Sequence, residues 1–270
     1  MAGLTIDAHV HVVAADRERY PLTPGTATNP WYETHPCDAD DLRVLMGEAG
    51  VDRAVVVQAV GAYSFDDDYV LDVGARHAGV LAPVVCTDRT SPNPVGVLDS
   101  LVRRGAQGYR WFTVGDDPRL DEPPELWRGL AATGLVVLVV CFPDRLDELV
   151  DLVPRLGPVR IALDHCGFAT FERGVPDALA ALAEWPNVHL KVTTEVLRAA
   201  GAVGDPAEVV AELMALAGGR CLWGSDWSQT HDVPYAALVE EGRRAAARLD
   251  DEGRAAYLGG TALTLWPGLA

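Results

Sequence analysis

The stretch Asp7-Ala8-His9-Val10-His11, inside an apolar run over residues 4–13, decides the fold of this chain. Residues two apart on a β-strand point to the same face, so a strand here presents His9 and His11 side by side. Two neighbouring imidazoles can share a divalent metal ion or one anionic group. The alternative is that each histidine only satisfies a backbone partner. The opposite face is expected to pack through Ala8, Val10 and Val12.

Seven further β-type runs follow, separated by helical segments. Several runs are apolar throughout, which is typical of parallel strands covered by helices. The eight predicted strands cover residues 4–13, 54–58, 81–86, 106–112, 135–142, 159–163, 188–192 and 221–223. Eight such units in 270 residues predict an α/β protein with a (β/α)8 TIM barrel, formed as a single domain over residues 1–270. An open doubly wound sheet is the weaker alternative, because no G-x-G-x-x-G follows the first strand.

Helices are predicted between the strands, many of them ending at a glycine and several beginning near a proline. They cover residues 38–49, 66–77, 94–104, 124–133, 143–156, 175–184, 206–217 and 233–248, with a short additional helix over 251–258. The connection over residues 14–37 is long. It is either a flap over the mouth of the barrel or an ordinary surface excursion, and it carries Tyr20, Trp31, Tyr32 and His35.

Composition and charge narrow the class of protein. Apolar residues make up 49% of the chain, and the net charge of −17 argues against nucleic acid and anionic membranes as partners. The five cysteines form no C-x-x-C pair, which indicates a reducing compartment rather than a disulfide framework. The N-terminal residues do not resemble a signal peptide, so we expect a cytoplasmic protein. The expected partner is a small molecule, and a homo-oligomer is left open.

Polar side chains also end later predicted strands, and in a TIM barrel these ends form the active site. Each has a structural alternative: a helix cap for Asp226, a satisfied core position for His165, and an ion pair for Arg110 or Lys191. Lys191 is the only lysine in a chain that otherwise uses arginine, which indicates a need for its compact charge.

Three motifs together resemble those of the amidohydrolase superfamily. They are the Asp7–His11 stretch, Leu-Asp-His-Cys-Gly at 163–167 and Trp-Gly-Ser-Asp-Trp at 223–227. Residues 51–59 and 108–110 are similar to the amidohydrolase-related (amidohydrolase 2) group, which includes 2-pyrone-4,6-dicarboxylate lactonase and L-fuconolactonase. The resemblance covers essentially the whole chain and implies a TIM barrel. Its strand-1 histidine pair, strand-6 histidine and strand-8 aspartate match His9 and His11, His165, and Asp226.

The resemblance also bears on metal binding. Binuclear members carry a bridging lysine or glutamate on strand 4 and a histidine on strand 5. Here strand 4 offers Arg110, which cannot ligate a metal, and strand 5 ends in Cys141 and Phe142. The resemblance therefore implies at most one divalent metal, Zn²⁺, on His9, His11 and Asp226, or no metal at all. Cys141 is a possible extra ligand, because a thiolate suits zinc.

The implied activity is that of a hydrolase that opens a lactone or a similar cyclic ester. Asp226 would be the general base that activates water, and His165 would orient the carbonyl or protonate the leaving oxygen. Arg110, Lys191 and His231 would bind an anionic or hydroxyl-rich substrate. Two alternatives remain open: a metal-dependent non-oxidative decarboxylase of the same superfamily, and a non-catalytic ligand-binding barrel.

Overall fold

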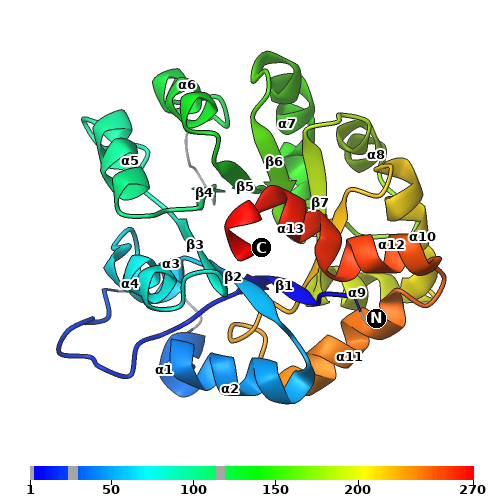
Figure 1. Ribbon diagram of the computed structural model, residues 1–270. Coiled ribbons are helices and arrows are strands. Elements are labelled where there is room, and N and C mark those ends of the chain that lie inside the picture. Colours follow the sequence, from blue (N-terminus) through cyan, green and yellow to red (C-terminus); the bar gives the residue numbers. More distant parts are fainter. Residues whose placement is uncertain (1–2, 24–29, 114–118) are drawn as a thin grey trace.

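The computed structural model describes residues 3–23, 30–113 and 119–270. Eight parallel strands pair in sequence order from β1 to β8. An isolated parallel bridge between Val10 and Trp227 brings the end of β8 back beside β1. Figure 1 shows the strands at the centre, surrounded by helices. The predicted (β/α)8 TIM barrel is therefore confirmed.

All eight predicted strands are present, with ends that differ by a few residues. Their middle residues are buried because each strand packs between the barrel interior and the surrounding helices. The strands are β1 Ile6–Val10, β2 Arg53–Val57, β3 Leu81–Val85, β4 Gly108–Phe112, β5 Val136–Val140, β6 Arg160–Leu163, β7 Val188–Thr193 and β8 Cys221–Gly224.

Each predicted helical segment contains a helix. These are α2 Ala39–Ala49, α4 Asp68–Arg76, α5 Pro94–Arg103, α6 Pro124–Thr133, α7 Leu146–Leu152, α8 Asp177–Ala183, α10 Pro206–Leu216, α11 Tyr235–Ala245 and α12 Asp251–Ala255. Four helices were not predicted: α1 Trp31–Thr34, α3 Val60–Tyr63, α9 Thr194–Gly201 and α13 Thr261–Leu265. Shorter 3₁₀ and π segments lie at Pro143–Arg145, Val153–Arg155, Asp164–Phe168, Ala256–Gly260 and Pro267–Leu269.

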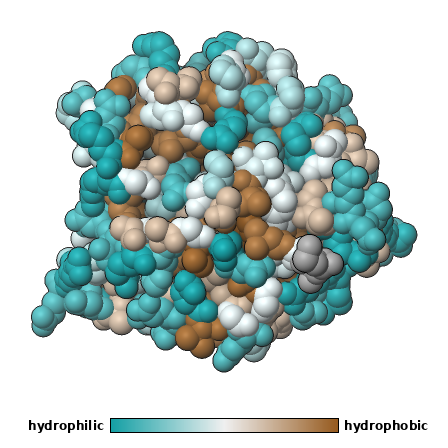
Figure 2. All heavy atoms as spheres, in the orientation of Figure 1, coloured by the Kyte–Doolittle hydropathy of each residue, from teal (hydrophilic) through white to brown (hydrophobic). Residues whose placement is uncertain are grey.

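The C-terminal segment closes the amino end of the barrel. Apolar residues from α13 and the following turn join the cluster inside the barrel, and in Figure 1 this segment crosses the centre of the view. Arg53 and Arg160, which begin β2 and β6, donate to the backbone oxygens of Leu269 and Leu265. Figure 2 shows hydrophilic residues over most of this face, with hydrophobic patches between them. The carboxyl ends of the strands are thus left to form the active site.

The prediction that Ala8 packs with Val10 and Val12 is wrong. The pairing of β1 with β2 shifts register between Asp7 and Val10. Ala8 joins Ile6 in the cluster inside the barrel, whereas Val10 and Val12 belong to the outer core. Such a β-bulge inserts one residue into a strand, so the residues after it point to the opposite face from the one expected.

The long first connection, expected as either a flap or a surface excursion, is described only in part, since its residues 24–29 lie outside the described residues. Trp31 and Tyr32 in α1 are buried. The five cysteines are buried, and none of them forms a disulfide in the described residues. Within the described ranges, no helix combines the length and apolar character needed to cross a membrane.

Candidate active site

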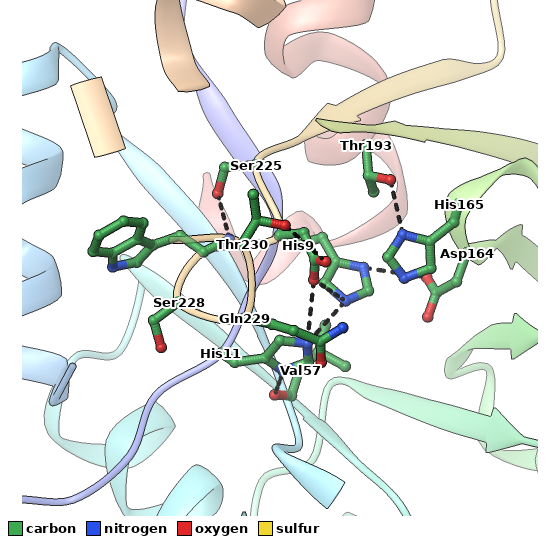
Figure 3. A network of polar contacts seen from close by, with 12 residues as sticks. His9, His11, Val57, Asp164, His165, Thr193, Ser225, Ser228, Gln229 and Thr230 are labelled. Atoms are coloured by element: carbon green, nitrogen blue, oxygen red, sulfur yellow. Dashed lines mark hydrogen bonds and ion pairs between the residues drawn. The ribbon is translucent and has the colours of Figure 1, made fainter. Parts of the chain in front are cut away.

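His9, His11 and Asp226 converge at the carboxyl end of the barrel. Figure 3 shows the two imidazoles close together. The Nε2 atoms of His9 and His11 are 3.3 Å apart. Asp226 Oδ1 lies 3.6 Å from His9 Nε2 and 3.4 Å from His11 Nε2. All three residues are at most 1% exposed. Three possible ligand atoms, from the carboxyl ends of β1 and β8 and the residues that follow, therefore face one another in a buried site.

Backbone hydrogen bonds hold these residues in register. Asp226 N donates to the His9 oxygen at 2.8 Å, and His11 N donates to the Trp227 oxygen at 2.5 Å. Thr230 then fixes the carboxylate, because its hydroxyl donates to Asp226 Oδ2 at 3.3 Å. The loop after β8 is thereby tied to β1 next to the two imidazoles.

The hydrogen bond at Nδ1 of His11 determines its tautomer. Nδ1 lies 2.9 Å from the backbone oxygen of Val57, which can only accept, so Nδ1 carries the proton. The lone pair of Nε2 is then directed at Asp226 and His9. The Trp31 ring lies 5.7 Å from the His11 ring and covers this side of the site.

These three atoms are spaced as ligands of one tetrahedral divalent ion would be. Nitrogen and oxygen ligands about 2.0–2.1 Å from zinc stand about 3.3 Å apart in tetrahedral geometry, close to the separations given above. Asp226 Oδ1 is buried and has no hydrogen-bond partner among the described residues. His9, His11 and Asp226 could therefore hold such an ion. Cys141 is in neither of the candidate ligand groups found in the described parts of the chain, and burial raises the pKa of its thiol to about 12.

Asp226 is held in its ionised form. Burial alone would raise the pKa of its carboxyl group, but the imidazoles of His11, His165 and His9 around it lower this pKa below its ordinary value. The carboxylate is therefore available as a proton acceptor or a ligand at neutral pH.

His165 follows β6 on an unusual left-handed turn. Residues 165–168 all have positive φ, between 48° and 64°, including His165, Cys166 and Phe168. This conformation is unfavourable for residues other than glycine. It stacks the Phe168 ring on His165, with centroids 4.6 Å apart, and leaves the His165 ring 4.8 Å from that of His9.

The His165 ring is fixed by a neighbouring strand. Its Nδ1 lies 2.8 Å from Thr193 Oγ1 at the end of β7, so its Nε2 is the nitrogen free for chemistry. Burial lowers the pKa of His165, which favours the neutral ring. Sequence analysis did not identify Thr193.

Asp164 is a second residue that sequence analysis missed as a site residue. It is fully buried, and three predicted site residues face it. Lys191 Nζ lies 2.9 Å from Oδ1, Arg110 Nε 3.3 Å from Oδ2, and His9 Nδ1 3.5 Å from Oδ1. Burial alone would raise the pKa of Asp164, but Lys191, His9 and Arg110 hold it well below its ordinary value. The single lysine was the available signal, because a buried ammonium needs a partner.

Arg110 and Lys191 are thus both brought to the site, and both are engaged by Asp164. Lys191 is fully buried, whereas Arg110 is 6% exposed and uses its Nε for this contact. Arg110 also lies over the Phe112 ring, with its Cζ 5.1 Å from the centroid.

His231 lies in the loop after β8 and stacks on His35 from the first connection, with ring centroids 3.8 Å apart. Its Nδ1 lies 2.8 Å from the Gln229 oxygen and 3.1 Å from the Ser228 oxygen. Carbonyl oxygens only accept, so Nδ1 carries the proton and Nε2 offers a lone pair.

Asp7, the carboxylate of the first motif, has a different environment. It accepts from the backbone nitrogens of Ser225 at 2.9 Å and His9 at 3.1 Å, and from the Tyr235 hydroxyl at 3.0 Å. Burial raises its pKa to about 6. Asp7 therefore links β1 to β8 and α11. It stabilises the positions of the site residues without being one of them.

Comparisons with known proteins agree with this fold. The family model for amidohydrolase matches residues 6–268. The chain is 30% identical to the L-fucono-1,5-lactonase of Burkholderia ambifaria over 277 residues, covering 95% of this chain and 93% of that protein. The structure of a putative 2-pyrone-4,6-dicarboxylic acid hydrolase from Pseudomonas putida matches with a TM-score of 0.80 and 23% identity, over 100% of both chains. An amidohydrolase from Burkholderia multivorans with bound zinc matches with a TM-score of 0.73 and 23% identity, over 98% of this chain and 99% of that one. This chain therefore belongs to the amidohydrolase family and is an amidohydrolase-related hydrolase.

Proposed function

We propose that this protein hydrolyses a lactone or a similar cyclic ester. The convergence of His9, His11 and Asp226 carries the proposal, because it joins an ionised carboxylate to two imidazoles in one buried site. The 30% identity to an L-fucono-1,5-lactonase across 95% of the chain supports the lactone as the substrate class.

Ester hydrolysis needs a base for water, a polarised carbonyl and a proton for the leaving oxygen. Asp226 is the base in this proposal, since its lowered pKa keeps it ionised at neutral pH. His165 directs Nε2 toward the substrate because Thr193 occupies its Nδ1. It orients the carbonyl or returns the proton to the leaving oxygen.

The proposal includes a place for one zinc ion. His9, His11 and Asp226 would hold it through the three atoms that converge at 3.3–3.6 Å. Its contribution when bound is Lewis-acid polarisation of the carbonyl oxygen. Without a metal, His9 and His11 could bind that oxygen only as hydrogen-bond donors, with a proton on Nε2.

Substrate binding is assigned to the groups around this centre. Arg110 would bind a carboxylate or a hydroxyl group through the guanidinium nitrogens that Asp164 does not engage. His231 would accept a hydrogen bond from a substrate hydroxyl group at Nε2. Lys191 adds positive charge to the site of a protein with a net charge of −17, which favours an anionic or hydroxyl-rich substrate.

A lactone panel with product analysis tests this function. It should contain sugar lactones and lactones that carry a carboxylate, assayed with metal-free and zinc-supplemented protein. We expect acid release and a product heavier than the substrate by one water. Carbon dioxide release would identify the non-oxidative decarboxylase instead, and tight binding without turnover would identify a binding barrel.

A further inference from the structure

His9 belongs to two groups of side chains that could hold a metal ion among the described residues. One group is His9 with His11 and Asp226, and the other is His9 with Asp164 and His165. The ring turns Nε2 toward the first group and Nδ1 toward the second. A neutral imidazole has one lone pair and one N–H, so His9 can act as a ligand or acceptor toward only one of them.

The surroundings of Asp164 decide between the two groups. An ionised carboxylate only accepts hydrogen bonds, and Lys191 at 2.9 Å and Arg110 at 3.3 Å favour the ionised form of Asp164. A metal ion between His9, Asp164 and His165 would share Oδ1 with the Lys191 ammonium, and like charges that close repel strongly in a buried site. The His9 nitrogen that faces Asp164, Nδ1, is therefore expected to carry the proton.

We propose that Asp164 is a positioning residue that accepts the Nδ1 proton of His9 and thereby directs the Nε2 lone pair at His11 and Asp226. His9 Nδ1 has no conventional hydrogen-bond partner in the described parts of the chain, and Asp164 Oδ1 is the carboxylate oxygen that faces it, at 3.5 Å. Carboxylates orient metal-binding histidines in this way in many proteins.

The two histidines of the first motif are then oriented alike. The Val57 oxygen takes the Nδ1 proton of His11, and Asp164 takes that of His9. Both Nε2 atoms, 3.3 Å apart, then point at the same place beside Asp226, as two ligands of one ion would. Lys191 acts on this site through Asp164, since its ammonium is fully buried against that carboxylate. The orientation of His9 does not depend on the proposed function. Only its purpose, to prepare the site for lactone hydrolysis, rests on that function.

The test compares Asp164→Leu, Lys191→Met and the double variant, because leucine has a size similar to that of aspartate and no hydrogen-bond acceptor. Titration with zinc gives the dissociation constant, and the ¹⁵N signals of labelled histidines in zinc-loaded protein report which nitrogen of His9 carries the proton. Asp164→Leu leaves a buried ammonium unpaired and is expected to lower stability. The double variant removes both charges, so it is the one to examine if the single variant fails to fold.

We expect wild-type His9 to carry its proton on Nδ1. In Asp164→Leu and in the double variant, the Nε2–H form should appear, and zinc affinity should fall about 10- to 100-fold. Asp67→Leu is the matched control, since Asp67 is also buried and accepts a backbone N–H, from Cys86. Its His9 signal should not change.

Two results would overturn the proposal. One is a wild-type His9 protonated on Nε2. The other is a double variant that recovers both stability and the wild-type tautomer, because Asp164 would then serve only to pair Lys191. Failure of the proposed function is a separate outcome, namely the absence of lactone turnover, since the tautomer is measured without substrate.

Discussion

Gly224 at the end of β8 lies so close to His9 that no side chain fits between them. A Cβ at position 224 would stand 2.7 Å from His9 Cβ and 2.9 Å from His9 N. The backbone nitrogen cannot move aside without shifting β1. The absence of a side chain at Gly224 is therefore what lets the first and last strands bring His9 and Asp226 together.

Gly224→Ala should displace His9 from Asp226. A shift of about 1 Å at a reacting group can reduce the rate by about 10²-fold, so we expect a loss of that order in kcat/KM on the true substrate. Gly47→Ala in α2 is the control, because nothing lies within 4 Å of its added Cβ. That variant should keep full activity, and an equal loss in both would contradict the close-approach argument.

Much of this fold could be predicted from the sequence because its signals are local. The buried apolar runs located all eight strands, and α6 begins and ends at the predicted residues, between Pro124 and Gly134. The helix α9 was missed because Thr194 begins it directly after β7, without a glycine or proline to mark the boundary.

The parts of the site that escaped prediction depend on long-range contacts. The shift in β1 that turns Ala8 inward is set by pairing with β2. The left-handed turn at His165 has only Gly167 as a local signal. Asp164 stood inside a recognised motif, but its part in the site appears only when β4 and β7 bring Arg110 and Lys191 to it.

Arg110 and Lys191 should respond differently to substitution. Arg110→Ala removes a guanidinium group that is available to bind substrate at the carboxyl end of the barrel. KM should therefore rise about tenfold, with a smaller change in kcat. Lys191→Met removes a buried partner of Asp164, so the free energy of unfolding should fall by about 3 kcal/mol. Steady-state kinetics and urea unfolding measure the two effects. A stable Lys191→Met variant with only a raised KM would instead indicate direct substrate binding.

His231 and His35 allow a matched comparison, because substitution of either residue removes the same stacking contact between their rings. His231→Ala also removes the Nε2 acceptor, so KM for a hydroxylated lactone should rise about fivefold, the effect of one hydrogen bond. His35→Ala should have a smaller effect on KM. Equal changes for lactones with and without the hydroxyl group would show that His231 does not bind it.

His189 in β7 should make stability depend on pH. Burial lowers its pKa from 6.5 to about 4, and its Nδ1 lies 3.3 Å from the Ile161 oxygen. As pH falls below 6.5, the unfolded chain binds a proton that the folded protein does not, so stability present above pH 6.5 is lost down to about pH 4. The loss from this residue is on the order of 3 kcal/mol.

His189→Asn keeps a donor near the position of Nδ1 and removes the titration. Urea unfolding of both proteins at several pH values between 7 and 4 measures the difference. The variant should lose less stability over this range, while the other buried histidines contribute equally to both proteins. Parallel curves would show that His189 does not titrate differently on folding.

Asp226→Asn tests the proposed chemistry most directly. The substitution keeps the size of the side chain and removes its basicity, so kcat should fall by about 10² or more. The melting temperature should change little, because the backbone bonds of residue 226 to His9 and Thr230 remain. Zinc content measured on the same protein separates two causes: loss of activity with zinc retained identifies the base, and loss of both identifies a ligand. A variant that keeps most of its activity would exclude Asp226 as the base.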